Sequence, residues 1–155
     1  MSDLSDLLLP DAVLSRVAAS AKKPLFQQIG ATAANVYGLD AAVVSEALAA
    51  REKLGSTGFG GGVATPHGKI AGLPRVMGVF ATLAQPIEFD AVDDLPVDLV
   101  FALLSPVEAG SAHLKALAQV SRALRDRNFL AKLRGTGSPD ALFALFSADE
   151  NRDAA

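Results

Sequence analysis

The stretch Val97-Asp-Leu-Val-Phe-Ala-Leu-Leu104 decides the fold class of this 155-residue chain. It is apolar apart from Asp98, and a second apolar run covers residues 76–83. Such short, near-continuous apolar runs are typical of strands that are covered on both faces of a sheet. Between them, Ile87 and Phe89 alternate with polar residues, which predicts a peripheral strand or hairpin arm. The two apolar strands therefore need covering elements on both sides.

Segments of helical period lie before and after this strand-rich middle. They are residues 22–37 (followed by Gly38 as a left-handed cap), a helix from Asp40 to Lys53, residues 111–125, residues 127–133, and a helix that starts at Ser138-Pro139-Asp140. Residues 13–17 could pair at a sheet edge. We therefore predict an α/β fold, a single-domain three-layer α/β/α sandwich over residues 1–148. Residues 149–155 form a frayed polar tail in this prediction.

Composition excludes several classes of protein. The chain has no cysteine, so it has no disulfide, thiol nucleophile or thiolate metal site, and its two histidines are too few for a structural zinc site. We expect neither a metal nor a cofactor. A net charge of −3 without a basic patch argues against nucleic acid and anionic membranes. The apolar runs are under half of the roughly 20 residues that a membrane span needs, and a cytoplasmic location is expected.

Glycines crowd the segment from Gly55 to Gly62, which holds five of them. Backbone N–H groups of such a segment could point at an anion, although a flexible surface loop has the same composition. A P-loop is excluded because Gly61-Gly62 stand where Lys and Ser/Thr are needed. A dinucleotide fingerprint is excluded because a helix precedes the segment and a strand follows it. ATP and NAD are therefore disfavoured.

Two histidines and one arginine are the candidate reactive groups. His67 follows Pro66 just past a predicted strand end, and a neutral imidazole can attack a phosphoryl donor. Arg51 continues the inward stripe of its helix and could bind phosphate oxygens, or pair with Glu52 in a salt bridge. His113 lies in the first turn of a helix, on its apolar face, where a hydrogen-bonded core histidine is the bland alternative.

These residues carry a resemblance to a known family. Residues 51–69, with Leu-Gly-Ser-Thr-Gly-Phe-Gly-Gly-Gly and Thr-Pro-His-Gly-Lys, resemble the active-site signature of fructose/mannitol-type enzyme IIA domains of the bacterial phosphoenolpyruvate-dependent phosphotransferase system. Residues 86–91, 96–104 and 113–118 are also similar, and the resemblance extends from Leu7 to Phe146. It implies a phosphotransferase component with a three-layer α/β/α sandwich and a mixed sheet.

The resemblance also implies roles for individual residues. His67 would be phosphorylated, His113 would be the second active-site histidine, and Arg51 would assist phosphate binding. The implied phosphate-binding residues are Ser56, Thr57, Gly58, Gly60 and Gly68. The sequence departs from the family at Gly61, where Asn is frequent, and at Thr65, where Ile is frequent.

Residues 51–56 and 78–104 look most similar to the nitrogen-type branch of this family. That branch takes phosphate from an HPr-like phosphocarrier protein (NPr) and regulates targets in potassium and nitrogen control, such as potassium transport or sensor proteins. Two alternatives stay open: a sugar-type IIA component that passes phosphate to a IIB domain, and an anion- or protein-binding module without phosphotransfer. Phe59 would either contribute to a docking surface or fold back onto the core.

Overall fold

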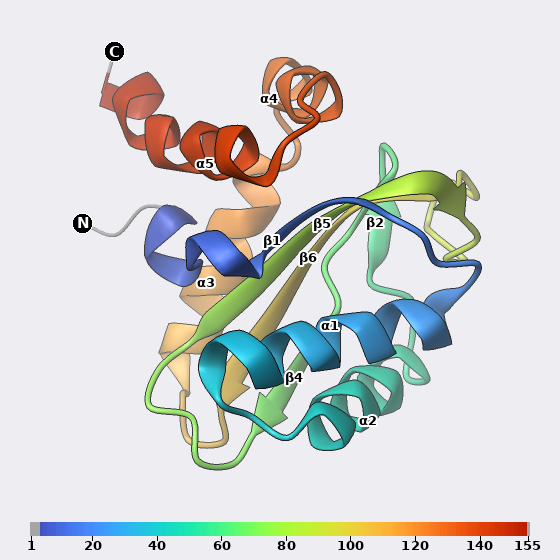
Figure 1. Ribbon diagram of the computed structural model, residues 1–155, viewed down its shortest axis with the longest axis vertical. Coiled ribbons are helices and arrows are strands. Elements are labelled where there is room, and N and C mark those ends of the chain that lie inside the picture. Colours follow the sequence, from blue (N-terminus) through green and yellow to red (C-terminus); the bar gives the residue numbers. More distant parts are fainter. Residues whose placement is uncertain (1–3, 155) are drawn as a thin grey trace.

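The computed structural model describes the backbone of residues 4–154 and the side chains of residues 4–147. Helices lie on both sides of one sheet (Figure 1). The elements are η1 (Leu4–Leu7), η2 (Pro10–Ala12), β1 (Val13–Val17), α1 (Lys22–Tyr37), α2 (Ala41–Glu52), β2 (Gly58–Gly60), β3 (Val63–Ala64), β4 (His67–Ile70), β5 (Met77–Ile87), β6 (Val97–Pro106), α3 (Ser111–Ala123), α4 (Arg127–Arg134) and α5 (Pro139–Ala154).

The sheet has six strands. Five of them follow the order β1-β5-β6-β3-β2, and β4 pairs with a later part of β6 than β3 does. β5 and β6 are antiparallel, with Phe80 opposite Phe101, whereas β1 runs parallel to β5, and β3 and β4 run parallel to β6. Residues 13–17 form β1 and pair with β5 at the edge of the sheet, as the sequence suggested. The two apolar runs thus form the central strands of a mixed sheet.

Alternate residues of the central strands enter two separate cores. Val79 and Val100 pack with α1 and α2 on one face, where Leu25, Ile29, Val44 and Leu48 are fully buried. On the other face lie the following side chains: Phe80, Phe101, Val120, Phe129 and Phe146. The sheet is therefore covered on both sides, as the near-continuous apolar runs predict, and the three-layer sandwich is confirmed.

Helix ends follow the capping residues of the sequence. α1 has the predicted bounds and ends at Gly38, whose φ of 71° is left-handed. The Asp40 carboxylate accepts the N–H groups of Ala42 and Val43 and so caps α2. Gly30 allows α1 and α2 to pack closely, because a Cβ there would lie 2.5 Å from the carbonyl oxygen of Ala41. This packing fixes the position of the α2 end, from which Arg51 projects.

Two predictions in the strand region are wrong. Ile87 does not belong to a separate peripheral strand: β5 continues through it, past a register shift, and Ile87 pairs with Val97. Phe89 lies in the following loop and is fully buried, because its ring packs edge-on against that of Phe26. Alternation with polar residues reflects the exposed end of β5 and not a new element.

The glycine-dense segment is a hairpin and not a loop. β2 and β3 are antiparallel, with Gly60 opposite Val63, and Gly61 and Gly62 form the turn between them. Their φ values of 69° and 80° are positive, which is what a two-residue hairpin turn of this hand needs and what glycine adopts without strain. The Gly61 N–H also donates to the Asp93 carboxylate. The two glycines are therefore explained by the geometry of the turn.

The C-terminal helix α5 begins as predicted, because the Ser138 hydroxyl accepts the N–H of Ala141. Its backbone continues to Ala154, through most of the predicted tail, while Ala155 lies outside the described residues. Within residues 4–154, no helix has the length and apolar character that crossing a membrane requires.

Candidate active site

His67 is the first residue of β4, where it lies opposite Leu103 of β6. It therefore starts a strand, whereas the sequence predicted a position just past a strand end. The preceding residue, Pro66, accepts the N–H of Leu103 at 2.9 Å, so backbone pairing holds the chain on the amino side of the imidazole. Gly68 lets β4 approach α2, since a Cβ there would lie 3.1 Å from that of Ala47. The half-buried ring of His67 is thus held between sheet and helix.

The hydrogen bonds of the His67 ring define its tautomer. Nδ1 lies 2.9 Å from the carbonyl oxygen of Thr65, which can only accept, so Nδ1 carries the proton. Nε2 accepts a hydrogen bond from the Nε–H of Arg51 at 3.2 Å. In this tautomer the ring presents its lone pair at Nε2, on the side of the guanidinium. A nucleophile with a fixed lone pair and an adjacent permanent cation is the result.

Arg51 lies in the last turn of α2 and is held at two points. Besides its bond to His67, its Nη1 donates to the carbonyl oxygen of Gly55 at 3.0 Å. The alternative of a salt bridge to Glu52 does not hold, because the Glu52 carboxylate pairs with Lys22 at 2.9 Å instead. Among residues 4–147, no carboxylate forms an ion pair with Arg51, and its guanidinium bonds to His67.

His113 lies in the first turn of α3 and approaches His67 from the opposite side. The two ring centroids are 5.3 Å apart, and Nδ1 of His113 lies 2.6 Å from the hydroxyl oxygen of buried Ser105. Burial lowers the pKa of His113 below its usual value, and the charges of His67 and Lys69 lower it further. The ring is neutral at neutral pH and can donate one N–H to a neighbouring group.

The buried face of α3 differs from the apolar face that the sequence predicts, and the difference is at Leu114. Leu114 precedes Leu117 by three residues and Val120 by six, a spacing that predicts a shared apolar face, yet its side chain is 65% exposed. The face that packs on the sheet is formed by Ala116, Val120 and Ala123. His113 shares this face, and Leu114 points to solvent beside the two rings.

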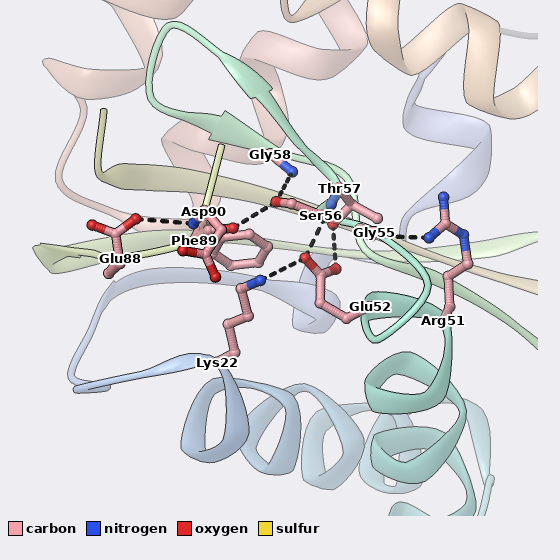
Figure 2. Close-up of polar contacts among 10 residues, drawn as sticks. All are labelled: Lys22, Arg51, Glu52, Gly55, Ser56, Thr57, Gly58, Glu88, Phe89 and Asp90. Carbon is pink, nitrogen blue, oxygen red and sulfur yellow. Dashed lines mark hydrogen bonds and ion pairs between the residues drawn. The ribbon is translucent and has the colours of Figure 1, made fainter. Parts of the chain in front are cut away.

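The implied phosphate-binding residues have internal partners in this structure (Figure 2). Thr57 donates both its N–H and its hydroxyl to the Glu52 carboxylate, at 3.0 and 2.7 Å. The Ser56 hydroxyl donates to the carbonyl oxygen of Phe89 and accepts the N–H of Gly58. Gly60 and Gly68 lie in the strand ladders of β2 and β4. The structure brings together Arg51, His67 and His113, and gives Ser56, Thr57 and Gly58 a supporting position.

Sequence reasoning missed three residues of this region: Lys22, Glu52 and Ser105. Glu52 was considered only as a partner of Arg51, although a charged residue four positions after Leu48 falls on the buried stripe of α2. That position was the available signal. Over residues 4–147, the His, Asp and Glu side chains form no group of three or more that could hold a metal ion.

The structure thus gathers, on an α/β/α sandwich, the two histidines and the arginine that the resemblance to phosphotransferase-system IIA domains singles out. In agreement with this class, the family described as "Phosphoenolpyruvate-dependent sugar phosphotransferase system, EIIA 2" matches residues 6–149. The chain belongs to this family.

Within the family, the chain resembles the nitrogen-regulatory type. It is 44% identical over 144 residues to the nitrogen regulatory protein of Bradyrhizobium diazoefficiens, covering 93% of this chain and 94% of that protein. The nitrogen regulatory protein of Escherichia coli is 41% identical over 148 residues, 95% of this chain and 91% of that one. The crystal structure of nitrogen regulatory protein IIA-Ntr from Neisseria meningitidis superposes with a TM-score of 0.86 at 35% identity, over 92% and 98% of the two chains.

Proposed function

We propose that the chain is a phosphohistidine carrier of a nitrogen-type phosphotransferase system. It accepts phosphate on His67 from an HPr-like phosphocarrier protein (NPr). The observation that carries this proposal is the tautomer of His67, in which Thr65 holds the proton on Nδ1 and leaves Nε2 as the nucleophile. The half-buried position of the ring leaves it open to a protein donor.

The transfer is a single displacement at phosphorus. The lone pair of His67 Nε2 forms a bond to the phosphorus of the donor's phosphohistidine, and the donor's N–P bond breaks. The bonding pair returns to the donor nitrogen, so no proton needs to move. The proton on Nδ1 stays with the Thr65 carbonyl, which stabilises the positive charge that the phosphorylated ring acquires.

Two neighbouring side chains stabilise the transferred group. The guanidinium of Arg51 exchanges its bond with Nε2 for bonds to the phosphoryl oxygens, while its second bond to Gly55 keeps it in place. His113 donates from Nε2 when the Ser105 hydroxyl donates to its Nδ1. Because the lowered pKa keeps His113 neutral, it does not repel the electropositive ring of His67.

The output of the carrier is regulatory in this proposal. Up to two negative charges on His67 reverse the local field between Arg51 and His113, and partner proteins that dock on this face sense the change. Similarity to nitrogen regulatory proteins supports targets in nitrogen control. Potassium transport or sensor proteins are further proposed targets, and the proposed location is the cytoplasm. The sugar-type alternative keeps the chemistry and changes only the acceptor, a IIB domain.

Incubation with phosphoenolpyruvate, enzyme I and the cognate HPr-like protein tests the proposal. Intact-mass measurement is expected to show one added phosphoryl group in the wild type and none in His67→Gln. His113→Gln serves as the comparison, and it should still gain the group, at a lower rate. An unmodified wild type would contradict the proposal and favour a binding module without phosphotransfer. Undiminished labelling of His67→Gln would show that another residue is phosphorylated. Subsequent transfer to a IIB domain would favour the sugar-type function.

A further inference from the structure

A chain of buried and part-buried hydrogen bonds runs from the start of α1 to the ring of His67. The Lys22 ammonium, at the first residue of α1, lies 2.9 Å from Oε2 of Glu52, at the last residue of α2. Glu52 is only 8% exposed, and its two oxygens also accept the N–H and the hydroxyl of Thr57. Figure 2 shows Lys22 and Thr57 reaching the same carboxylate from opposite sides.

The chain continues from Thr57 through the backbone. The carbonyl oxygen of Thr57 accepts the N–H of Thr65 at 3.0 Å, and the carbonyl oxygen of Thr65 accepts the Nδ1–H of His67 at 2.9 Å. Thr57 and Thr65 are both buried. Hydrogen bonds that are shielded from water are electrostatically stronger than exposed ones, and bonds in series polarise one another. Each link therefore restrains the next, up to the reactive imidazole.

We propose that Glu52, neutralised by Lys22, is a positioning residue for phosphotransfer that fixes the ring of His67 through Thr57 and Thr65. This inference rests on the proposed function of His67, and it concerns Glu52, which does not touch the ring itself. Glu52 holds the segment before the hairpin against α2. Thr65 is thereby placed so that its carbonyl oxygen selects the tautomer with the lone pair on Nε2.

The chemistry of Glu52 suits this task better than that of a packing residue. A buried carboxylate is unfavourable unless a cation and hydrogen bonds satisfy it, and here Lys22 and two donors of Thr57 do so. The Lys22 ammonium also lies 4.7 Å from the centroid of the Phe89 ring, whose carbonyl oxygen binds Ser56. Both residues that follow Gly55 are thus tied to the same charged pair.

The discriminating variant is Glu52→Gln, which keeps the side-chain volume. An amide has one acceptor oxygen, so Gln cannot satisfy both Thr57 donors and Lys22 together. Asp98→Asn is the matched control, because it removes the carboxylate of the 2.8 Å pair between Asp98 of β6 and Arg134 of α4. Thr57→Val is a second test variant: it removes only the hydroxyl bond to Glu52 and retains the pair with Lys22.

Two readouts distinguish positioning from general stability. The first is the nitrogen NMR signature of the His67 ring in the unphosphorylated protein, at a pH where imidazole is neutral. The second is the rate of phosphotransfer from the HPr-like donor at saturating donor concentration. We expect Glu52→Gln to populate both tautomers and to slow transfer roughly tenfold to a hundredfold, as expected for a misplaced reacting group. Thr57→Val is expected to shift both readouts in the same direction, and Asp98→Asn neither.

The proposal is overturned if the folded variants keep the wild-type tautomer and rate. It is also overturned if Asp98→Asn changes both readouts to the same extent, because the effect would then report stability alone. Thr57→Val decides the matter if Glu52→Gln does not fold. The tautomer signature needs no phosphotransfer, so a wild type that fails to accept phosphate contradicts the proposed function without deciding the role of Glu52.

Discussion

The Nε–H of Arg51 donates to Nε2 of His67 across 3.2 Å, so a permanent cation lies against the lone pair of the candidate nucleophile. The two residues are 16 positions apart and come from different elements, the end of α2 and the start of β4. The arrangement favours one tautomer of the ring before transfer and places a guanidinium within reach of phosphoryl oxygens after it.

Removal of the Arg51 guanidinium should impair transfer without unfolding the domain. Arg51 is half-buried at the end of α2 and makes side-chain bonds only to His67 and Gly55 among those described. We expect Arg51→Gln to lower the rate constant for phosphorylation about a hundredfold, the usual effect of losing one preorganised donor. Arg127→Gln, at the exposed start of α4, is the control, and rapid-quench labelling measures both. Equal rates for the two variants would remove Arg51 from the mechanism.

The titration of His113 should report the phosphorylation state of His67. Burial is the largest cause that lowers the pKa of His113, the charge of His67 lowers it further, and a phosphoryl group on His67 would bring negative charge to the same place. We expect the pKa of His113, measured by NMR titration, to rise on phosphorylation of His67. An unchanged titration would show that His113 does not face the transferred group.

The same pKa gives a dependence of stability on pH. The pKa of His113 is lower in the folded state than its value of about 6.5 in the unfolded chain, so the unfolded chain binds the proton more tightly. The stabilising contribution of neutral His113 is complete above that pH and is lost as pH falls through the folded-state pKa. We expect His113→Gln to lose less unfolding free energy than the wild type on acidification below about pH 6.5, measured by urea titration. Parallel curves would contradict the lowered pKa.

Substitution of Gly68, next to His67, should affect both the stability of the domain and the rate of phosphorylation. A Cβ at this position would lie 3.1 Å from the Cβ of Ala47 and 3.3 Å from its carbonyl carbon, so Gly68→Ala should push β4 away from α2. We expect a loss of about 1–3 kcal/mol in unfolding free energy together with slower phosphorylation, because His67 is the adjacent residue. Gly30→Ala, which crowds the carbonyl oxygen of Ala41 between α1 and α2, should lower stability but leave the rate unchanged when folded.

Two exposed leucines, three residues after Arg51 and one residue after His113, should contribute to donor binding. Leu54 is 84% exposed beside Arg51 and Leu114 is 65% exposed beside His113. We expect Leu54→Ser and Leu114→Ser each to raise the KM for the HPr-like donor up to about tenfold and to leave kcat near the wild-type value. Val92→Ser, which alters an equally exposed side chain on the loop after β5, is the control. An unchanged KM in both leucine variants would exclude this docking surface.

Of the two positions predicted for Phe59, a docking surface or a side chain folded back onto the core, the structure shows the second. Its ring packs against the core on the α3–α5 side of the sheet and lies 5.5 Å from the guanidinium carbon of Arg125. The tip of a glycine-rich segment suggested exposure, but the segment is a hairpin whose strand β2 turns this side chain inward. An apolar residue between glycines is therefore insufficient to predict a docking contact.

Periodicity predicted the layers and the strands because burial on both faces leaves a continuous apolar run, as in β6. It also placed Arg51 and His113 on inward faces, since spacing along a helix fixes direction. The partners of these residues could not be predicted in the same way. Lys22 and Glu52 are 30 positions apart, and their contact depends on how α1 packs on α2 through Gly30.

The glycine-dense segment shows why the remaining details were missed. Glycine density indicates unusual dihedral angles, but it does not distinguish a hairpin turn from an anion-binding loop. The hydroxyl of Thr57 is equally ambiguous, because only the tertiary structure shows that Glu52 already accepts its proton. The exposed residues 84–86 interrupt the apolar pattern of β5, so the sequence predicts a separate strand at Ile87.

Nitrogen NMR of the phosphorylated protein, with histidine rings labelled with nitrogen-15, tests the central claim most directly. The phosphorus–nitrogen coupling identifies the bonded atom. We predict a single phosphoryl group on Nε2 of His67, with the proton retained on Nδ1 beside the Thr65 carbonyl. Phosphorus bonded to Nδ1 of His67, or to either nitrogen of His113, would contradict the account.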